Sequence, residues 1–95
     1  MPFVHIRHKV ADYTKWKRVL LAATAFRKAN GELSLQAFRS SDDPKDVTVI
    51  CEWSSAAKAR KFVRSPELRK RMKQAGVVGK PMIQFFGKAE DLSLR

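Results

Sequence analysis

The segment of residues 47–80, VTVICEWSSAAKARKFVRSPELRKRMKQAGVVGK, constrains the fold more than any other part of the chain. Residues 47–53 alternate in the way typical of a strand. A helix follows and is interrupted near Ser65 and Pro66, where Ser65 can cap a new helix and Pro66 suits its first position. Gly76 is predicted to end this second helical piece. The segment therefore predicts a strand–helix unit with a restarted helix.

A second strand–helix unit lies at the N-terminus. Residues 3–10 predict a strand that places Phe3, His5, Arg7 and Lys9 on one face. A helix is predicted over residues 13–29, with Asp12 as its N-cap. Apolar residues recur in this helix at the spacing of a buried stripe: Trp16, Val19, Leu20, Ala23 and Phe26.

Two more strands complete the pattern, over residues 32–40 and 82–86. Between strands two and three, residues 40–46 are rich in turn formers and predict a hairpin loop. Gly79 and Pro81 are predicted to turn the chain before the last strand. In the second strand, alternation predicts one shared face for three apolar side chains: Leu33, Leu35 and Ala37.

The element order β-α-β-β-α-β predicts an α+β, ferredoxin-like subunit, in which both helices cover one face of a four-stranded antiparallel sheet. We expect a single domain over residues 1–88 and a short tail over residues 89–95. The other face of the sheet would be bare and partly apolar. Because such a face needs a partner, we predict a homodimer whose two sheets face each other and form an α/β barrel.

The formal net charge is +11, from 20 Lys and Arg against 9 Asp and Glu. A charge of this sign favours contact with nucleic acid, anionic membranes or anionic metabolites. Stacking aromatics are missing from the basic helical region, so a solvated helix face is favoured and nucleic acid is not the expected partner. The chain has no apolar run of membrane-spanning length and no secretory signal, and Cys51 has no second cysteine to pair with. These features predict a cytoplasmic protein without a membrane partner.

The face of the sheet away from the helices holds the candidate site. His5 is a candidate general base, Arg7 could stabilise an enolate or phenolate, and Glu52 could orient one of them. Aromatic and amide side chains are predicted around these three and could bind a small aromatic ligand: Phe3, Gln36, Phe38, Ile50, Gln84 and Phe86.

A structural interpretation of the same residues is an Arg7–Glu52 salt bridge at a dimer interface, with His5 beside it, and this interpretation is favoured. A slip of one residue in the first strand would exchange His5 for His8 on this face. His5 and His8 are three residues apart and lie on opposite faces, so no metal site is expected. Cys51 is interpreted as a small core residue. No Gly-rich phosphate or dinucleotide loop is present, and no cofactor is expected.

Three stretches, HKVADYTKWK, DDPKDVTVICEW and ARKFVRSPELRKRMKQAGVVGKP, carry a resemblance that spans about residues 3–87. Their markers are D-Y-x-x-W, the E-W that ends the third strand, and S-P-E-L followed by A-G-V-x-G-x-P. With these markers the chain resembles small proteins of the dimeric α/β-barrel superfamily related to the antibiotic-biosynthesis monooxygenases. The resemblance implies a ferredoxin-like subunit, a dimer, and a ligand cavity between sheet and helices.

Characterised relatives of this kind include cofactor-independent oxygenases acting on polyketide phenols and quinones, and haem-degrading enzymes. The resemblance implies catalytic sets of an Asn with a Trp, plus Arg or His. Here the only Asn is Asn30, predicted at a helix end, and Trp16 and Trp53 are interpreted as helix–sheet packing. The first hypothesis is therefore a dimeric protein that binds a small aromatic or polyketide-like molecule, with monooxygenase or isomerase activity. The alternative is a non-catalytic module that contacts a polyanion through its basic helices.

Overall fold

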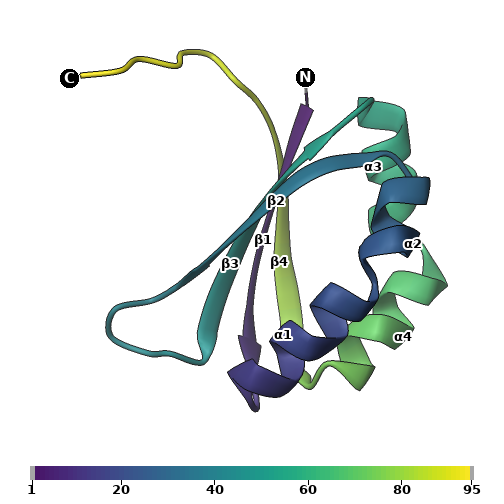
Figure 1. Ribbon diagram of the computed structural model, residues 1–95, viewed down its shortest axis with the longest axis vertical. Helices are drawn as coiled ribbons and strands as arrows, with labels where there is room; N and C mark the ends of the chain where they lie inside the picture. The colour runs from purple at the N-terminus through teal and green to yellow at the C-terminus, as the bar shows by residue number, and fades with distance from the viewer. Residues whose placement is uncertain (1, 95) are drawn as a thin grey trace.

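Four strands form one antiparallel sheet in the order β2-β3-β1-β4, as Figure 1 shows for the computed structural model. The structure describes residues 2–94, so Met1 and Arg95, the outer ends of the predicted domain and tail, lie outside the described residues. The strands are β1 (Pro2–Val10), β2 (Glu32–Arg39), β3 (Asp46–Trp53) and β4 (Val77–Gly87). The helices are α1 (Tyr13–Ala22), α2 (Thr24–Ala29), α3 (Ala56–Val63) and α4 (Pro66–Gln74).

All four helices cover the same face of the sheet, and Figure 1 shows the other face uncovered. The element order is β-α-α-β-β-α-α-β because each predicted helix is split in two. This arrangement confirms the predicted α+β, ferredoxin-like fold. We refer below to the uncovered side of the sheet as the open face.

The predicted helix over residues 13–29 is wrong in one respect, because it breaks at Ala23. The hydroxyl of Thr24 donates to the carbonyl of Leu21 over 2.8 Å, and the guanidinium of Arg27 donates to the carbonyl of Leu20. Side chains that take helix carbonyls compete with the backbone for them. The break turns α2 so that Arg27 reaches back toward α1.

The predicted restart between α3 and α4 is confirmed. The Ser65 hydroxyl accepts hydrogen bonds from the amides of Glu67 and Leu68 over 3.1 and 3.4 Å, and Pro66 is the first helical residue. Gly76 follows the end of α4 with a φ of +80°, a conformation that favours glycine.

The predicted turn at Gly79 and Pro81 is wrong, because both residues lie within β4, which is longer than expected. The register between β1 and β4 shifts between Arg7 and Lys9, and Gly79 has a φ of +75° in this irregular stretch. Between these pairs, two steps along β1 correspond to four along β4, so a bulge with a glycine in the left-handed region accommodates two extra residues without ending the strand.

A second register shift, between Glu32 and Ser34 of β2, changes the facing of that strand's first residues. Leu33 is exposed rather than packed beside Leu35 as predicted. Glu32 is buried instead. The shift therefore brings a carboxylate to the side of the sheet that the helices cover.

The core lies between the sheet and the helices. Alternate residues of β1 and β3 point into it and are met by the apolar sides of the helices. The buried cluster includes Val4, Ile6, Val10, Trp16, Val47, Val49, Trp53, Ala59 and Phe62. Residues 88–94 form neither helix nor strand, and Figure 1 shows them leaving the end of β4. Within the described residues, no helix is both long and apolar enough to cross a membrane.

Candidate functional site

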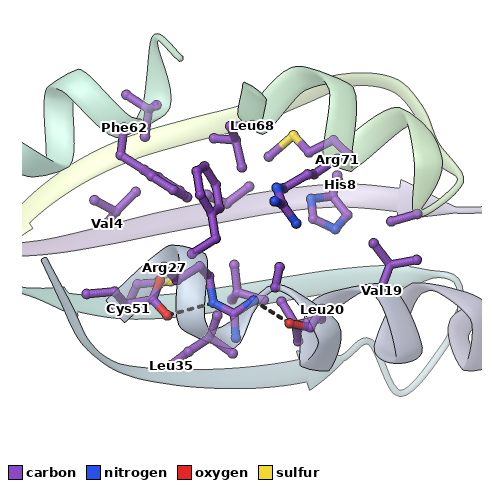
Figure 2. Close-up of a pocket in the computed structure, with 18 of the residues that line it drawn as sticks. Val4, His8, Val19, Leu20, Arg27, Leu35, Cys51, Phe62, Leu68 and Arg71 are labelled. Carbon is purple, nitrogen blue, oxygen red and sulfur yellow. Dashed lines mark hydrogen bonds and ion pairs between the residues drawn. The ribbon is translucent and has the colours of Figure 1, made fainter. Parts of the chain in front are cut away.

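A cavity of about 80 Å³ lies between the sheet and the helices, and we call it the sheet–helix cavity. Its floor is made by alternate residues of the two central strands: Val4, Ile6 and His8 from β1, and Val49, Cys51 and Trp53 from β3. Figure 2 shows that helical side chains from two sides meet over this floor. The lining is almost entirely apolar, so the few polar groups in it decide what it can bind.

His8 is the first of these polar groups. It is only 6% exposed, and neither ring nitrogen has a hydrogen-bond partner within residues 2–94. Its ring meets that of Trp16 edge-on, with 5.7 Å between the centroids. Burial lowers the pKa of His8, and the charge of Asp46 offsets only part of that shift. At neutral pH His8 is therefore an uncharged imidazole that can accept a proton.

The indole nitrogen of Trp53 is the second. Trp53 is 1% exposed and packs against Phe62 with 4.7 Å between ring centroids. Its Nε1 is buried and has no acceptor in the part of the chain that the structure describes. A buried polar group left unpaired costs about 1–3 kcal/mol. Three such nitrogens on two residues lining one cavity indicate a site that a polar ligand would satisfy.

Arg27 and Glu32 form a buried ion pair at the cavity wall, with 2.9 Å between Nε and Oε1. Arg27 also donates to the Leu20 carbonyl and, over 3.4 Å, to the Thr24 hydroxyl. Figure 2 shows the guanidinium of Arg27 with dashed contacts on two sides, one of them to Leu20. Burial raises the pKa of Glu32, and Arg27 opposes that shift. Because its donors are occupied, Arg27 has a structural role.

Cys51 lines the cavity beside this pair. Burial, and then the negative charge of Glu32, raises the pKa of the Cys51 thiol well above its usual range. A thiol that stays protonated at neutral pH is a poor nucleophile. Cys51 is therefore a small apolar wall residue, in agreement with the interpretation from the sequence.

Arg71 reaches the cavity from α4. Its Nε donates to Glu67 over 3.1 Å, and its guanidinium carbon lies 4.3 Å from the centroid of the Phe26 ring. Figure 2 shows the guanidinium of Arg71 directed into the cavity, which His8 also lines. A cation and an uncharged base therefore both line the cavity.

The nine residues predicted from the sequence as a site lie together on the open face, opposite the cavity. Cross-strand pairing sets them in rows: Phe3 with Glu52 and Phe86, His5 with Ile50 and Gln84, and Gln36 with Ile50. Arg7 and Phe38 both oppose Thr48 in the next row. His5 Nδ1 lies 3.4 Å from Gln84 Oε1.

Within one chain, Arg7 and Glu52 do not form the predicted contact. Arg7 forms its ion pair with Asp46, over 2.7 Å, and this pairing raises the pKa of Arg7 and lowers that of Asp46. Glu52 sits opposite Phe3, four residues further along β3 than Thr48, the cross-strand neighbour of Arg7. At the rise of a strand this is roughly 13 Å.

Sequence reasoning missed Arg27, Glu32 and Arg71, and it placed His8 only as an alternative to His5. For His8 a signal existed, since it alternates with Val4 and Ile6 on the strand face that packs inward. Arg27 falls four residues after Ala23, on the apolar stripe of its helix. The burial of Glu32 depends on the register shift in β2, which the sequence pattern does not reveal.

Asn30 does not line the cavity in the described structure. It caps α2, and its side-chain amide donates to the Phe26 carbonyl over 2.7 Å. Trp16 and Trp53 both pack between helices and sheet, as interpreted from the sequence, and both also line the cavity.

A family model described as antibiotic biosynthesis monooxygenase matches residues 5–74. SnoaB, a cofactor-independent oxygenase from Streptomyces nogalater, has a similar structure with a TM-score of 0.74 and 15% identity, covering 96% of this chain and 94% of that one. The monooxygenase from the ActVA-Orf6 gene of Streptomyces coelicolor, solved in complex with nanaomycin D, is also similar. Its TM-score is 0.70 and its sequence identity is 21%, and the match covers 99% of this chain and 92% of that one. No curated protein has a matching sequence.

Proposed function

Because the chain belongs to the antibiotic biosynthesis monooxygenase family, we propose that it is an oxygenase that binds an aromatic or polyketide-like substrate in the sheet–helix cavity. One observation carries the proposal: an apolar cavity in which the nitrogens of His8 and Trp53 have no partner among residues 2–94. The description of SnoaB as cofactor-independent and the nanaomycin D bound by the Streptomyces coelicolor enzyme support the same chemistry.

The proposed substrate is a phenol with an unsubstituted ring carbon. His8 takes the phenolic proton, which gives an electron-rich phenolate whose charge Arg71 stabilises. The phenolate reduces O₂ directly, and a C–O bond forms at the ring carbon ortho or para to the phenolate oxygen. The protonated His8 returns the phenolic proton to the bound peroxide, which gives a hydroperoxide. The ring proton then leaves the same carbon as the O–O bond breaks, and it joins the departing hydroxide, which leaves a quinone and water. The balance is phenol plus O₂ to quinone plus water, with the substrate as the only reductant.

The test is oxygen uptake with 1-naphthol, and binding of nanaomycin D and 1,4-naphthoquinone measured by calorimetry. We expect one O₂ consumed per quinone formed, with one ¹⁸O from labelled O₂ in the product and one in water. Heat-denatured protein is the control for autoxidation. Failure of nanaomycin D and 1,4-naphthoquinone to bind, together with no oxygen uptake above the denatured control with 1-naphthol, would contradict the proposal.

Isomerase activity is a second candidate for the same site, since a base and a cation beside an apolar cavity can also move a proton along an enol. Conversion of a substrate under anaerobic conditions would favour this candidate. The alternative to an enzyme is a non-catalytic module that contacts a polyanion through its basic helices. Binding of duplex DNA or heparin that weakens steeply with salt, in the absence of any oxygen uptake, would favour it.

We also propose that the chain is a homodimer joined through the open face. Three large apolar side chains are about half exposed there: Phe38 (51%), Met82 (53%) and Phe86 (50%). An uncovered sheet face with this much apolar surface gains from pairing with a second copy. Light scattering that gives only monomer at micromolar concentration would contradict this.

We propose a second, separate ligand site for the open-face residues. His5 and Arg7, with Glu52 at the next rows, would bind a small aromatic ligand between two copies of the sheet. Single replacements of His5 and His8 distinguish the two sites, because each histidine lies on only one face of the sheet. Loss of ligand binding in one variant alone identifies the face that binds the ligand.

A further inference from the structure

The two arginines that line the sheet–helix cavity differ in how their donors are used. Arg27 donates from Nε to Glu32, from Nη1 to the Leu20 carbonyl and from Nη2 to Thr24. Arg71 donates only from Nε, to Glu67, among the residues that the structure describes. Its two terminal nitrogens therefore remain available to a ligand.

Arg71 is also held in place at the cavity. Its guanidinium lies over the ring of Phe26, so that it bridges α4 and α2 across the space between the two helix pairs. The Glu67 contact spans one turn of α4 and fixes the other edge of the guanidinium. Figure 2 shows the free end of the guanidinium directed into the cavity that His8 also lines. A positioned guanidinium with two open donors matches the two oxygens of a carboxylate.

The surface around Arg71 favours an anionic ligand. Arg69, Lys70 and Lys73 are exposed on α4, and Glu67 is the only acid of that helix. Together with the net charge of +11, these cations give a positive field at this end of the molecule. Such a field raises the local concentration of anions.

We propose that the ligand is an aromatic carboxylic acid, with its rings in the sheet–helix cavity and its carboxylate bound by Arg71. This rests on the proposed function, since it assigns the ligand class of the same cavity. His8 accepts a hydrogen bond from a hydroxyl next to the carboxylate, as in a hydroxy-naphthoic acid. The apolar lining from both helix pairs contacts the rings.

The experiment compares 2-naphthoic acid with 2-naphthamide, which has the same shape without the charge. Both are titrated by calorimetry into the wild-type chain, Arg71→Gln and Arg69→Gln, in 150 mM salt. The two variants remove the same charge from the same helix, and only Arg71 lines the cavity. Wild type should bind the acid at least tenfold more tightly than the amide, because a charge-assisted bidentate pair is lost with the amide.

In Arg71→Gln the acid and the amide should bind with about equal affinity, whereas Arg69→Gln should keep the preference for the acid. Arg71→Lys keeps the charge without the planar fork and should retain part of the preference, which guards against loss of fold in the glutamine variant. Equal binding of acid and amide to wild type, or an unchanged preference in Arg71→Gln, would overturn the inference while leaving an aromatic site intact. Absence of binding by both compounds would overturn this inference and the proposed function together.

Discussion

Each face of the sheet carries a histidine from β1, and the two histidines differ in whether their ring nitrogens have hydrogen-bond partners. On the open face His5 lies beside Gln84, and Arg7 is paired with Asp46. On the helix face His8 has no partner for either ring nitrogen within the described chain. A single strand, β1, supplies both histidines three residues apart. The comparison teaches that residue type alone does not mark a ligand site; the state of its hydrogen bonds does.

The difference follows from burial. Water can complete the hydrogen bonds of a polar group on an exposed sheet face at little cost. Inside the sheet–helix cavity an unpaired donor or acceptor costs about 1–3 kcal/mol, so the fold keeps it only where something offsets that cost. We attribute the retention of His8 at a core position to ligand binding.

The largest effect should come from exchanging one histidine at a time. His8→Gln should lower oxygen uptake about 10²- to 10⁴-fold, because it removes the base that we propose ionises the substrate. His5→Gln should leave the rate within about twofold, since its side chain is on the opposite face. Oxygen-electrode assays with 1-naphthol measure both. If His5→Gln were the inactive variant, the roles of the two faces would be reversed.

The next effect concerns the ion pairs of the two faces. Arg27→Leu leaves Glu32 buried without its partner and should lower the free energy of unfolding by about 3–5 kcal/mol. Arg7→Leu breaks the more exposed pair with Asp46 and should lower the free energy of unfolding clearly less. Urea denaturation followed by circular dichroism provides the comparison. Equal losses would mean that the cavity wall is as hydrated as the open face.

A double replacement sharpens this test. Arg27→Leu with Glu32→Leu removes both buried charges, and it should recover much of the stability that the single replacement loses. If the double variant were less stable than Arg27→Leu alone, the pair would contribute net stability to the cavity wall.

A smaller effect is expected for the apolar part of the open face. Phe86→Asp should weaken the proposed dimer by about tenfold or more, because it removes a half-exposed aromatic and adds a charge. Leu21→Asp is the matched control, since Leu21 is exposed on the helix side. Sedimentation or light scattering over a concentration series gives the dissociation constants. An unchanged dimer in Phe86→Asp would place the interface elsewhere.

The smallest effect is a pH dependence of stability. Burial lowers the folded-state pKa of His8, so the unfolded chain binds a proton more readily than the folded one. The contribution of His8 is therefore present above the ordinary value of 6.5 and is lost as the pH falls toward the folded-state pKa. The drop in Tm between pH 7.5 and 5.5 should be smaller in His8→Gln than in His5→Gln. A steeper drop in His8→Gln would contradict a buried, uncharged His8.

The sequence predicted the elements of the fold well where local chemistry decides them. Strand alternation placed His5 and Arg7 on one face, and Ser65 with Pro66 marked the restart that the structure confirms. The break at Ala23 and the bulge at Gly79 were missed, because they depend on side chains and strands that meet only in the folded chain.

The candidate site was harder to predict than the fold. Glu32 enters the cavity wall only because the β2 register shifts, and Arg71 reaches the cavity only because α4 packs beside α2. That the ring nitrogens of His8 and the indole nitrogen of Trp53 have no hydrogen-bond partner among residues 2–94 is a property of packing, which no pattern of residue types encodes. Composition and periodicity therefore predicted a site on the open face, where polar residues alternate along the strands.

The central claim is that the ligand binds beside His8 in the sheet–helix cavity, and nuclear magnetic resonance tests it directly. The chain has 2 histidines, so a two-dimensional ¹H–¹⁵N spectrum of the imidazoles contains only the rings of His5 and His8. Titration with 2-naphthoic acid or nanaomycin D should shift the signals of His8 and leave those of His5 in place. Shifts confined to His5 would contradict the account and move the site to the open face.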